Sequence, residues 1–149
     1  EFFFSLVSAT TSWLIIDMNT RRMVRNPELA SSPETCVFEH AIEEPADKIV
    51  FPTEVEPELA GSHKVVWSDI DTMAHVNNVR YVCWALDAVS QETLQKYPLK
   101  EIIVNYDAEV LLDEEVQLYR VIQNMDEGIT VYIQGRVEDK PKFCVKLIF

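Results

Sequence analysis

The stretch that decides the fold reads SDIDTMAHVNNVRY and covers residues 68–81. It sets the carboxylate of Asp71 and the imidazole of His75 before an apolar run at helical spacing. Two amides, Asn77 and Asn78, begin that run, and Asn is a favoured helix N-cap. A helix N-terminus offers unpaired N–H groups and partial positive charge, which polarise a carbonyl and stabilise an oxyanion. We therefore expect a site for acyl transfer, with Asp71 or His75 acting as or positioning a general base. Taken singly, Asp71 is a common turn residue and His75 a common structural residue before a helix.

The segments around this stretch predict one buried helix and an antiparallel sheet. A helix is expected over residues 77–95, where four aliphatic residues recur at helical spacing: Val79, Val82, Leu86 and Val89. Its first turns are apolar nearly all round, which predicts burial on most sides. One strand is expected before the helix and four after it, over residues 63–68, 101–111, 115–124, 129–137 and 142–149. This order predicts an α+β fold in which an antiparallel sheet wraps around a long central helix.

The part of the chain before residue 62 has two different compositions. Residues 2–16 are rich in aromatic and β-branched residues and contain no Gly or Pro, so they predict one long strand or two short ones. Such an apolar strand needs a sheet, and no pairing partner is evident nearby. We therefore expect residues 1–17 to be the last strand of a domain that is otherwise missing. Residues 18–61 are rich in Pro and Glu, which predicts an irregular connector, and residues 62–149 form the next domain.

Charge excludes two classes of partner. The chain of 149 residues carries a formal net charge of −12, whereas phosphate binding needs a basic surface, so neither nucleic acid nor an anionic membrane is expected as a partner. One cationic cluster stands out and consists of Arg21, Arg22 and Arg25. It is either a solvated turn or a docking site for an acidic partner. The opening residues carry no basic region and are interrupted by Ser and Thr, so they fit neither a signal peptide nor a membrane span.

No metal or nucleotide site is predicted. The histidines at positions 40, 63 and 75 have no close partner at ligand spacing, and there is no Gly-rich phosphate loop. The three cysteines form no CxxC pair, and their odd count favours a reducing compartment.

Three segments together resemble one known family. The pattern Asp-x-Asp-x-x-x-His-Val-Asn-Asn-x-x-Tyr, from Asp69 to Tyr81, is similar to the signature of hotdog acyl thioesterases, and most closely to the fatty acyl-ACP thioesterases of plants and bacteria. Residues 105–109, Asn-Tyr-Asp-Ala-Glu, resemble a strand segment of that family. Residues 8–22, SATTSWLIIDMNTRR, resemble the end of its N-terminal hotdog. The family is built from two hotdogs in tandem, so the resemblance implies the last strand of the first and the whole of the second.

The resemblance implies both an activity and the residues that perform it. The activity is hydrolysis of fatty acyl-ACP to free fatty acid and ACP, which ends fatty acid elongation. Asp71, His75 and Glu109 would occupy the catalytic positions, with Glu109 as general base or orienter towards water. The carbonyl would be held at the helix N-terminus by residues Val76, Asn77, Asn78 and Val79. No cofactor is expected.

The resemblance also implies a partner and a location. The partner is an acyl carrier protein, with the cluster of Arg21, Arg22 and Arg25 as its possible docking site. A homo-oligomer, most simply a homodimer, is expected. The location is the cytoplasm for a bacterial protein and the plastid stroma for a plant one.

Two positions depart from the family pattern. Many members carry Asn two residues before the His, where this chain has Met73, and Met cannot hydrogen-bond as an amide does. Either Asp71 or one of the helix-start amides takes over that role, or activity is reduced. Val110 stands where some plant members have Cys, which excludes a cysteine nucleophile there. Cys83 is no substitute, because an apolar helix favours the neutral thiol.

Two other functions remain open at this stage. One is a single-hotdog acyl-CoA thioesterase of the 4-hydroxybenzoyl type, which has no use for residues 8–22 or the long connector. The other is a non-catalytic hotdog that binds acyl thioesters, which Met73 favours and the intact Asp71, His75 and Glu109 disfavour. The length and saturation of the acyl chain do not follow from the sequence.

Overall fold

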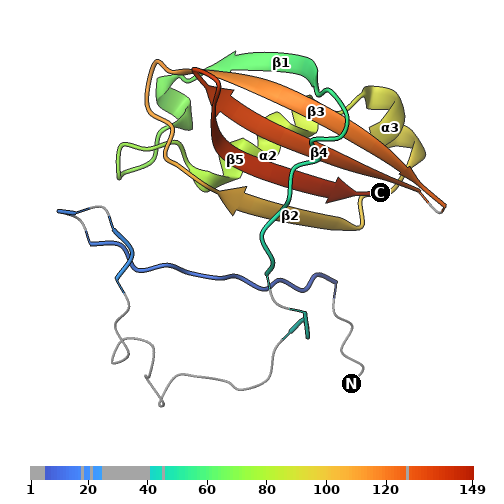
Figure 1. Ribbon diagram of the computed structural model, residues 1–149, viewed down its shortest axis with the longest axis horizontal. Helices are drawn as coiled ribbons and strands as arrows, with labels where there is room; N and C mark the ends of the chain where they lie inside the picture. Colours follow the sequence, from blue (N-terminus) through green and yellow to red (C-terminus); the bar gives the residue numbers. More distant parts are fainter. Residues whose placement is uncertain (1–5, 18, 21, 25–40, 45, 127) are drawn as a thin grey trace. The chain divides into compact units, whose positions relative to one another are not determined.

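Residues 58–148 contain the five strands of one antiparallel sheet (Figure 1). In the computed structural model the strands are β1 (Glu58–Lys64), β2 (Glu101–Tyr106), β3 (Glu115–Met125), β4 (Gly128–Val137) and β5 (Lys140–Ile148). Their order across the sheet is β1-β3-β4-β5-β2, and every neighbouring pair is antiparallel. The helical elements η1 (Trp67–Asp69), α2 (Asn78–Asp87) and α3 (Gln91–Lys96) lie between β1 and β2 in the chain. This arrangement confirms the predicted hotdog fold.

The structure describes residues 6–17, 19–20, 22–24, 41–44, 46–126 and 128–149. They belong to two compact units, Glu1–Asp47 and Lys48–Phe149. Among the described residues of the first unit, one antiparallel bridge is found, between Ile16 and Met23. The strand predicted over residues 2–16 is reduced, in its described part, to this bridge, because residues 6–15 are in no ladder and a strand needs ladder pairing to exist.

The first two strands of the second unit differ from the prediction: β2 ends at Tyr106, whereas the predicted strand runs to residue 111. The first strand ends at Lys64, and residues 67–69 form a 3₁₀ turn in place of the predicted strand end. The carboxylate of Asp69 causes this turn, because it accepts a hydrogen bond from the Val66 N–H at 3.0 Å. The predicted domain start at residue 62 therefore falls inside β1, which begins within the segment predicted as a connector.

The single long helix predicted over residues 77–95 is two helices. α2 ends at Asp87 and α3 starts at Gln91, because Ser90 acts as an N-cap whose hydroxyl accepts a hydrogen bond from the Thr93 N–H at 3.2 Å. The guanidinium of Arg120 donates to the Ala88 carbonyl at 2.6 Å and so satisfies the end of α2 from the neighbouring sheet.

The face of α2 that meets the sheet differs from the predicted aliphatic stripe at Val79, whereas Leu86 packs against the core and Val89, just after the helix, is buried in it. Its buried residues are Tyr81, Trp84 and Ala85, and the Tyr81 and Phe143 rings pack edge-on with centroids 4.7 Å apart. Val79 is 65% exposed. Two residues along an α-helix turn the side chain by about 200°, so burying Tyr81 turns Val79 away from the sheet. Figure 1 shows α2 crossing one face of the sheet.

Candidate active site

The residues before α2 form a tight loop closed by Asp71. Its carboxylate accepts hydrogen bonds from the Met73 N–H at 2.8 Å and the His75 N–H at 3.4 Å, and its own N–H donates to the His75 carbonyl at 2.9 Å. Ala74 has a φ of 62°, a left-handed conformation that closes the turn at some cost for a residue with a Cβ. An antiparallel bridge between Ile70 and Val76 holds the base of the loop. Asp71 therefore shapes the backbone that presents His75.

His75 faces Glu109, which comes from the loop between β2 and β3. The His75 Nε2 and Glu109 Oε2 atoms lie 3.4 Å apart, with side chains 28% and 45% exposed. The two loops are tied together beside this pair, because the Val76 N–H donates to the Val110 carbonyl at 3.0 Å. The structure thus brings together two of the three residues predicted as catalytic. An imidazole beside a carboxylate, open to solvent, can move a proton to or from water.

The start of α2 is an anchored helix N-terminus, as the Asn-Asn pair predicts. The Asn77 side chain accepts from the Val79 N–H at 3.0 Å, and its carbonyl accepts from the Arg80 N–H at 2.8 Å. The N–H of Asn77 itself donates to the Asp69 carbonyl at 2.8 Å.

These bonds reduce the number of N–H groups that can bind an oxyanion. The N–H groups of Val76, Asn77 and Val79 all have acceptors within the protein. Within the part of the chain that the structure describes, the Asn78 N–H is the one of the four predicted positions with no acceptor. Asn78 is exposed and is the first residue of α2, where the partial positive charge is concentrated. Of the four backbone N–H groups predicted to bind an oxyanion, the Asn78 N–H is therefore the candidate that remains.

The buried carboxylate of Asp69, which was not predicted as a site residue, connects the residues around the start of α2. Asp69 is 2% exposed and binds His63 Nε2 at 2.8 Å and Arg80 Nε at 3.0 Å. Burial would raise its pKa, but the hydrogen bonds from the Val66 N–H and His63, with the charges of His63 and Arg80, hold the pKa of Asp69 below its ordinary value. The Asp-x-Asp pattern contains this residue, yet only the fold brings His63 and Arg80 to it.

Two tyrosines line the other side of the site. Burial raises the pKa of Tyr81 to about 12, against a hydrogen bond with the Val110 backbone that lowers it, and the nearby Glu109 charge also raises it. Tyr106 donates from its hydroxyl to the Asn78 carbonyl at 3.2 Å, and burial raises its pKa as well. Both phenols therefore stay protonated near neutral pH and act as neutral groups beside the pair of His75 and Glu109.

Other predicted positions have varied surroundings. The Met73 side chain is 62% exposed, and Val110 is fully buried. Burial raises the pKa of the Cys144 thiol to about 12, so this thiol is neutral near pH 7.

Of the cationic cluster, Arg22 is exposed, whereas positions 21 and 25 lie outside the described residues. Among the described residues, no three His, Cys, Asp or Glu side chains are grouped closely enough to share a metal ion. No helix in the described ranges is long and apolar enough to cross a bilayer.

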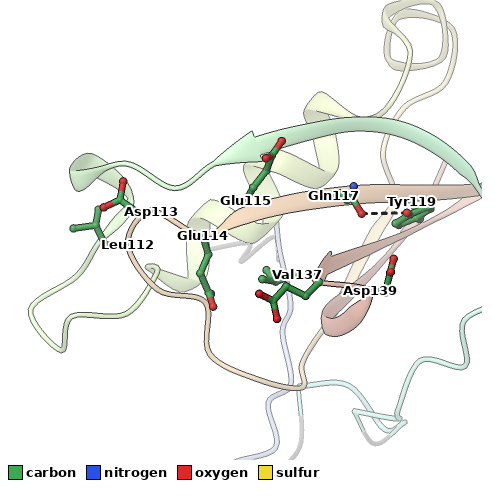
Figure 2. Close-up of a pocket in the computed structure, with 9 residues that line it drawn as sticks. Leu112, Asp113, Glu114, Glu115, Gln117, Tyr119, Val137 and Asp139 are labelled. Carbon is green, nitrogen blue, oxygen red and sulfur yellow. Dashed lines mark hydrogen bonds between the residues drawn. The ribbon is translucent and has the colours of Figure 1, made fainter.

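A pocket in the described part of the chain lies away from the pair of His75 and Glu109. It has a volume of about 720 Å³ and is lined mainly by side chains of residues 112–119 and 137–139 (Figure 2). Five of these side chains are carboxylates, at positions 113, 114, 115, 138 and 139. Such a lining disfavours both a fatty acyl chain and an acidic carrier protein. The pair of His75 and Glu109 is outside it.

Comparison with known proteins agrees with the geometry. Residues 53–143 match the family model of the acyl-ACP thioesterase C-terminal domain. The chain is 27% identical to the chloroplastic acyl-[acyl-carrier-protein] hydrolase FATB1 of Cuphea viscosissima, over 92% of this chain and 37% of that protein. It is also 27% identical to the chloroplastic oleoyl-acyl carrier protein thioesterase 2 of Arabidopsis thaliana, over 82% of this chain and 35% of that protein.

Solved structures show the same fold. An acyl-ACP thioesterase from Bacteroides thetaiotaomicron superposes with a TM-score of 0.68 at 23% identity, over 90% of this chain and 52% of that one. The 12:0-ACP thioesterase from Umbellularia californica superposes with a TM-score of 0.73 at 15% identity, over 89% and 51%. This chain therefore spans just over a third of those curated relatives and about half of these solved structures.

Proposed function

Because this chain belongs to the acyl-ACP thioesterase family through its C-terminal domain, we propose that it provides the hydrolytic centre for fatty acyl-ACP thioesters. The observation that carries the proposal is the 3.4 Å approach of His75 Nε2 to Glu109 Oε2 beside the N-terminus of α2. A general base and a helix N-terminus at one place are the two elements that hydrolysis of a thioester requires.

In the proposed reaction, the Glu109 carboxylate takes a proton from water as the water oxygen attacks the thioester carbonyl carbon. The negative charge that develops on the carbonyl oxygen is stabilised by the Asn78 N–H and the helix dipole. His75 orients the Glu109 carboxylate through Nε2. The intermediate then collapses, the C–S bond breaks, and the proton held by Glu109 passes to the leaving thiolate, which gives free acid and thiol.

The proposed roles of the remaining residues follow from their contacts. Asp71 acts through the loop backbone, since its carboxylate accepts from the Met73 and His75 N–H groups. Asn77 caps the helix by accepting a hydrogen bond from the Val79 N–H. Met73 supplies no amide at the position where many members have Asn, so we propose that the rate is below that of members with Asn.

We propose an acyl carrier protein as the physiological carrier of the substrate. The names of the relatives FATB1 and oleoyl-acyl carrier protein thioesterase 2 support this choice. The net charge of −12 opposes an acidic partner, which makes the cluster of Arg21, Arg22 and Arg25 the proposed docking point.

The proposal extends to assembly and location. Residues 1–17 would belong to a first hotdog, the connector from residue 18 would end before β1 at Glu58, and the active protein would be a homo-oligomer. It would act in the cytoplasm of a bacterium or in the plastid stroma of a plant.

The test measures free fatty acid released from acyl-ACP and from acyl-CoA of the same chain length, side by side. We expect hydrolysis of both thioesters with a higher kcat/KM for acyl-ACP. Preference for acyl-CoA would favour the single-hotdog acyl-CoA enzyme. Tight binding without release of acid from either substrate would show a binding protein and refute the proposal.

A further inference from the structure

The loop that carries Glu109 runs between two charged side chains. Lys142, on β5, donates from Nζ to the Glu109 carbonyl at 2.9 Å and is only 18% exposed. Its Nζ also lies 3.8 Å from Glu114 Oε1. The other oxygen of Glu114 accepts a hydrogen bond from the Leu111 N–H at 2.8 Å. We propose that this Lys142–Glu114 clamp positions Glu109 against His75, an inference that rests on the proposed function.

The clamp fixes the peptide plane next to the base. A charge-assisted hydrogen bond on the Glu109 carbonyl holds the peptide unit between Glu109 and Val110. Val110 on its far side is fully buried, and its carbonyl accepts from the Val76 N–H of the His75 loop. The peptide unit that follows the Glu109 Cα is thus held at the Glu109 carbonyl and, one residue further on, at the Val110 carbonyl, which keeps the Glu109 side chain within reach of His75.

The backbone of Lys142 contributes a second, independent anchor. Its carbonyl accepts hydrogen bonds from the N–H groups of Asp107 and Ala108, both at 2.9 Å, at the end of β2. These backbone bonds survive any substitution of the Lys142 side chain. Removing only the ammonium group therefore releases the Glu109 carbonyl while the start of the loop stays attached to β5. This makes Lys142 a positioning residue that can be tested without dismantling the sheet.

The test compares three variants of the full protein: Lys142→Met, Lys142→Arg and Lys140→Met. Lys140 lies on the same strand and is exposed, so its substitution removes the same charge away from the clamp. In Lys142→Met we expect kcat on acyl-ACP to fall by roughly 10- to 100-fold with KM little changed, because small displacements of a catalytic group have effects of this size. Lys142→Arg retains a positive donor and should recover most of the lost kcat. Lys140→Met should behave as wild type.

Two further measurements separate positioning from a general loss of structure. Thermal melting should change far less than kcat, and amide hydrogen exchange of residues 109–111 should speed up in Lys142→Met while that of β3 and β4 stays slow. If Lys142→Met fails to fold, Glu114→Gln tests the same clamp from its other half, with the same direction expected for kcat and exchange. Unchanged kcat and unchanged exchange in the folded variant, or loss of kcat that Lys142→Arg does not recover, would overturn the inference.

Failure of the proposed function would have a different signature. A wild-type protein that hydrolyses no acyl thioester refutes the function, and the clamp is then decided by the exchange of residues 109–111 alone.

Discussion

Asp69, with a side chain that is 3% exposed, binds the Arg80 guanidinium at 3.0 Å, and this contact attaches the loop before α2 to the first turn of the helix. The same carboxylate also binds His63 and the Val66 N–H. Its backbone carbonyl accepts from the Asn77 N–H, the residue that caps α2. Three elements that surround the candidate active site are therefore joined at one buried group.

Replacing Asp69 by Ala should lower the free energy of unfolding by roughly 1–3 kcal/mol, since the Val66 N–H loses its acceptor and the His63 ring and the Arg80 guanidinium lose their partner. The pKa of Asp69 is lowered in the folded state, so its contribution is fully present above the unfolded-state value of about 3.9 and is lost as pH falls through the lower, folded-state pKa. Urea unfolding of both proteins at pH 7 and in acid checks this. A difference that grows in acid would contradict it.

Replacing Glu109 by Gln or His75 by Ala should reduce kcat by roughly 100-fold or more, the size expected when a general base or its partner is lost. The matched control is Glu115→Gln, which removes a carboxylate from an exposed position of β3. Steady-state release of fatty acid from acyl-ACP is the measurement. Near-normal turnover of Glu109→Gln would remove Glu109 from the mechanism.

Replacing Met73 by Asn should raise kcat, by roughly 10-fold or more if the amide adds a hydrogen bond to the transition state. The loop should tolerate the change, because Met73 is 62% exposed and it is its N–H, not its side chain, that binds Asp71. Met73→Leu serves as the control and should leave kcat as it is. If Asn and Leu give the same rate, the missing amide is not what limits this protein.

Replacing Gly135 by Ala should destabilise the fold by roughly 1–3 kcal/mol, because the added Cβ would overlap the ring of Phe143, which packs on Tyr81. Gly61→Ala is the control: a Cβ there meets open space and should leave the midpoint of urea unfolding almost unchanged. Equal effects of the two substitutions would show that the Phe143 ring can move aside at little cost.

Local sequence signals predicted the last three strands and the start of α2 closely. The runs after residue 100 are bounded by acidic turns, and β3, β4 and β5 begin and end within two residues of their predicted bounds. The segment from Asp69 to Tyr81 is itself a loop followed by a helix start, so its composition specifies its conformation. The N-cap at Asn77 could therefore be predicted from residues that are neighbours in the chain.

The errors arose where a distant group decides the local structure. Residues 67–69 form a 3₁₀ turn in place of the predicted end of the first strand, because the buried Asp69 has His63 and Arg80 as partners. The predicted burial of Val79 was wrong because helical periodicity gives a stripe, whereas the aromatic packing of Tyr81 and Phe143 decides which stripe faces the sheet.

The sequence by itself determined the class of fold, the start of α2 and the two side chains that meet at the site. Only the tertiary structure decided which backbone N–H remains available and what holds Glu109 in place. The physical reason is that strand alternation, turn residues and caps act over a few residues. By contrast, the Val76 N–H is bonded by the Val110 carbonyl, and the Glu109 carbonyl is bonded by the Lys142 ammonium group. These partners are distant in the chain and come into reach only when the sheet has formed.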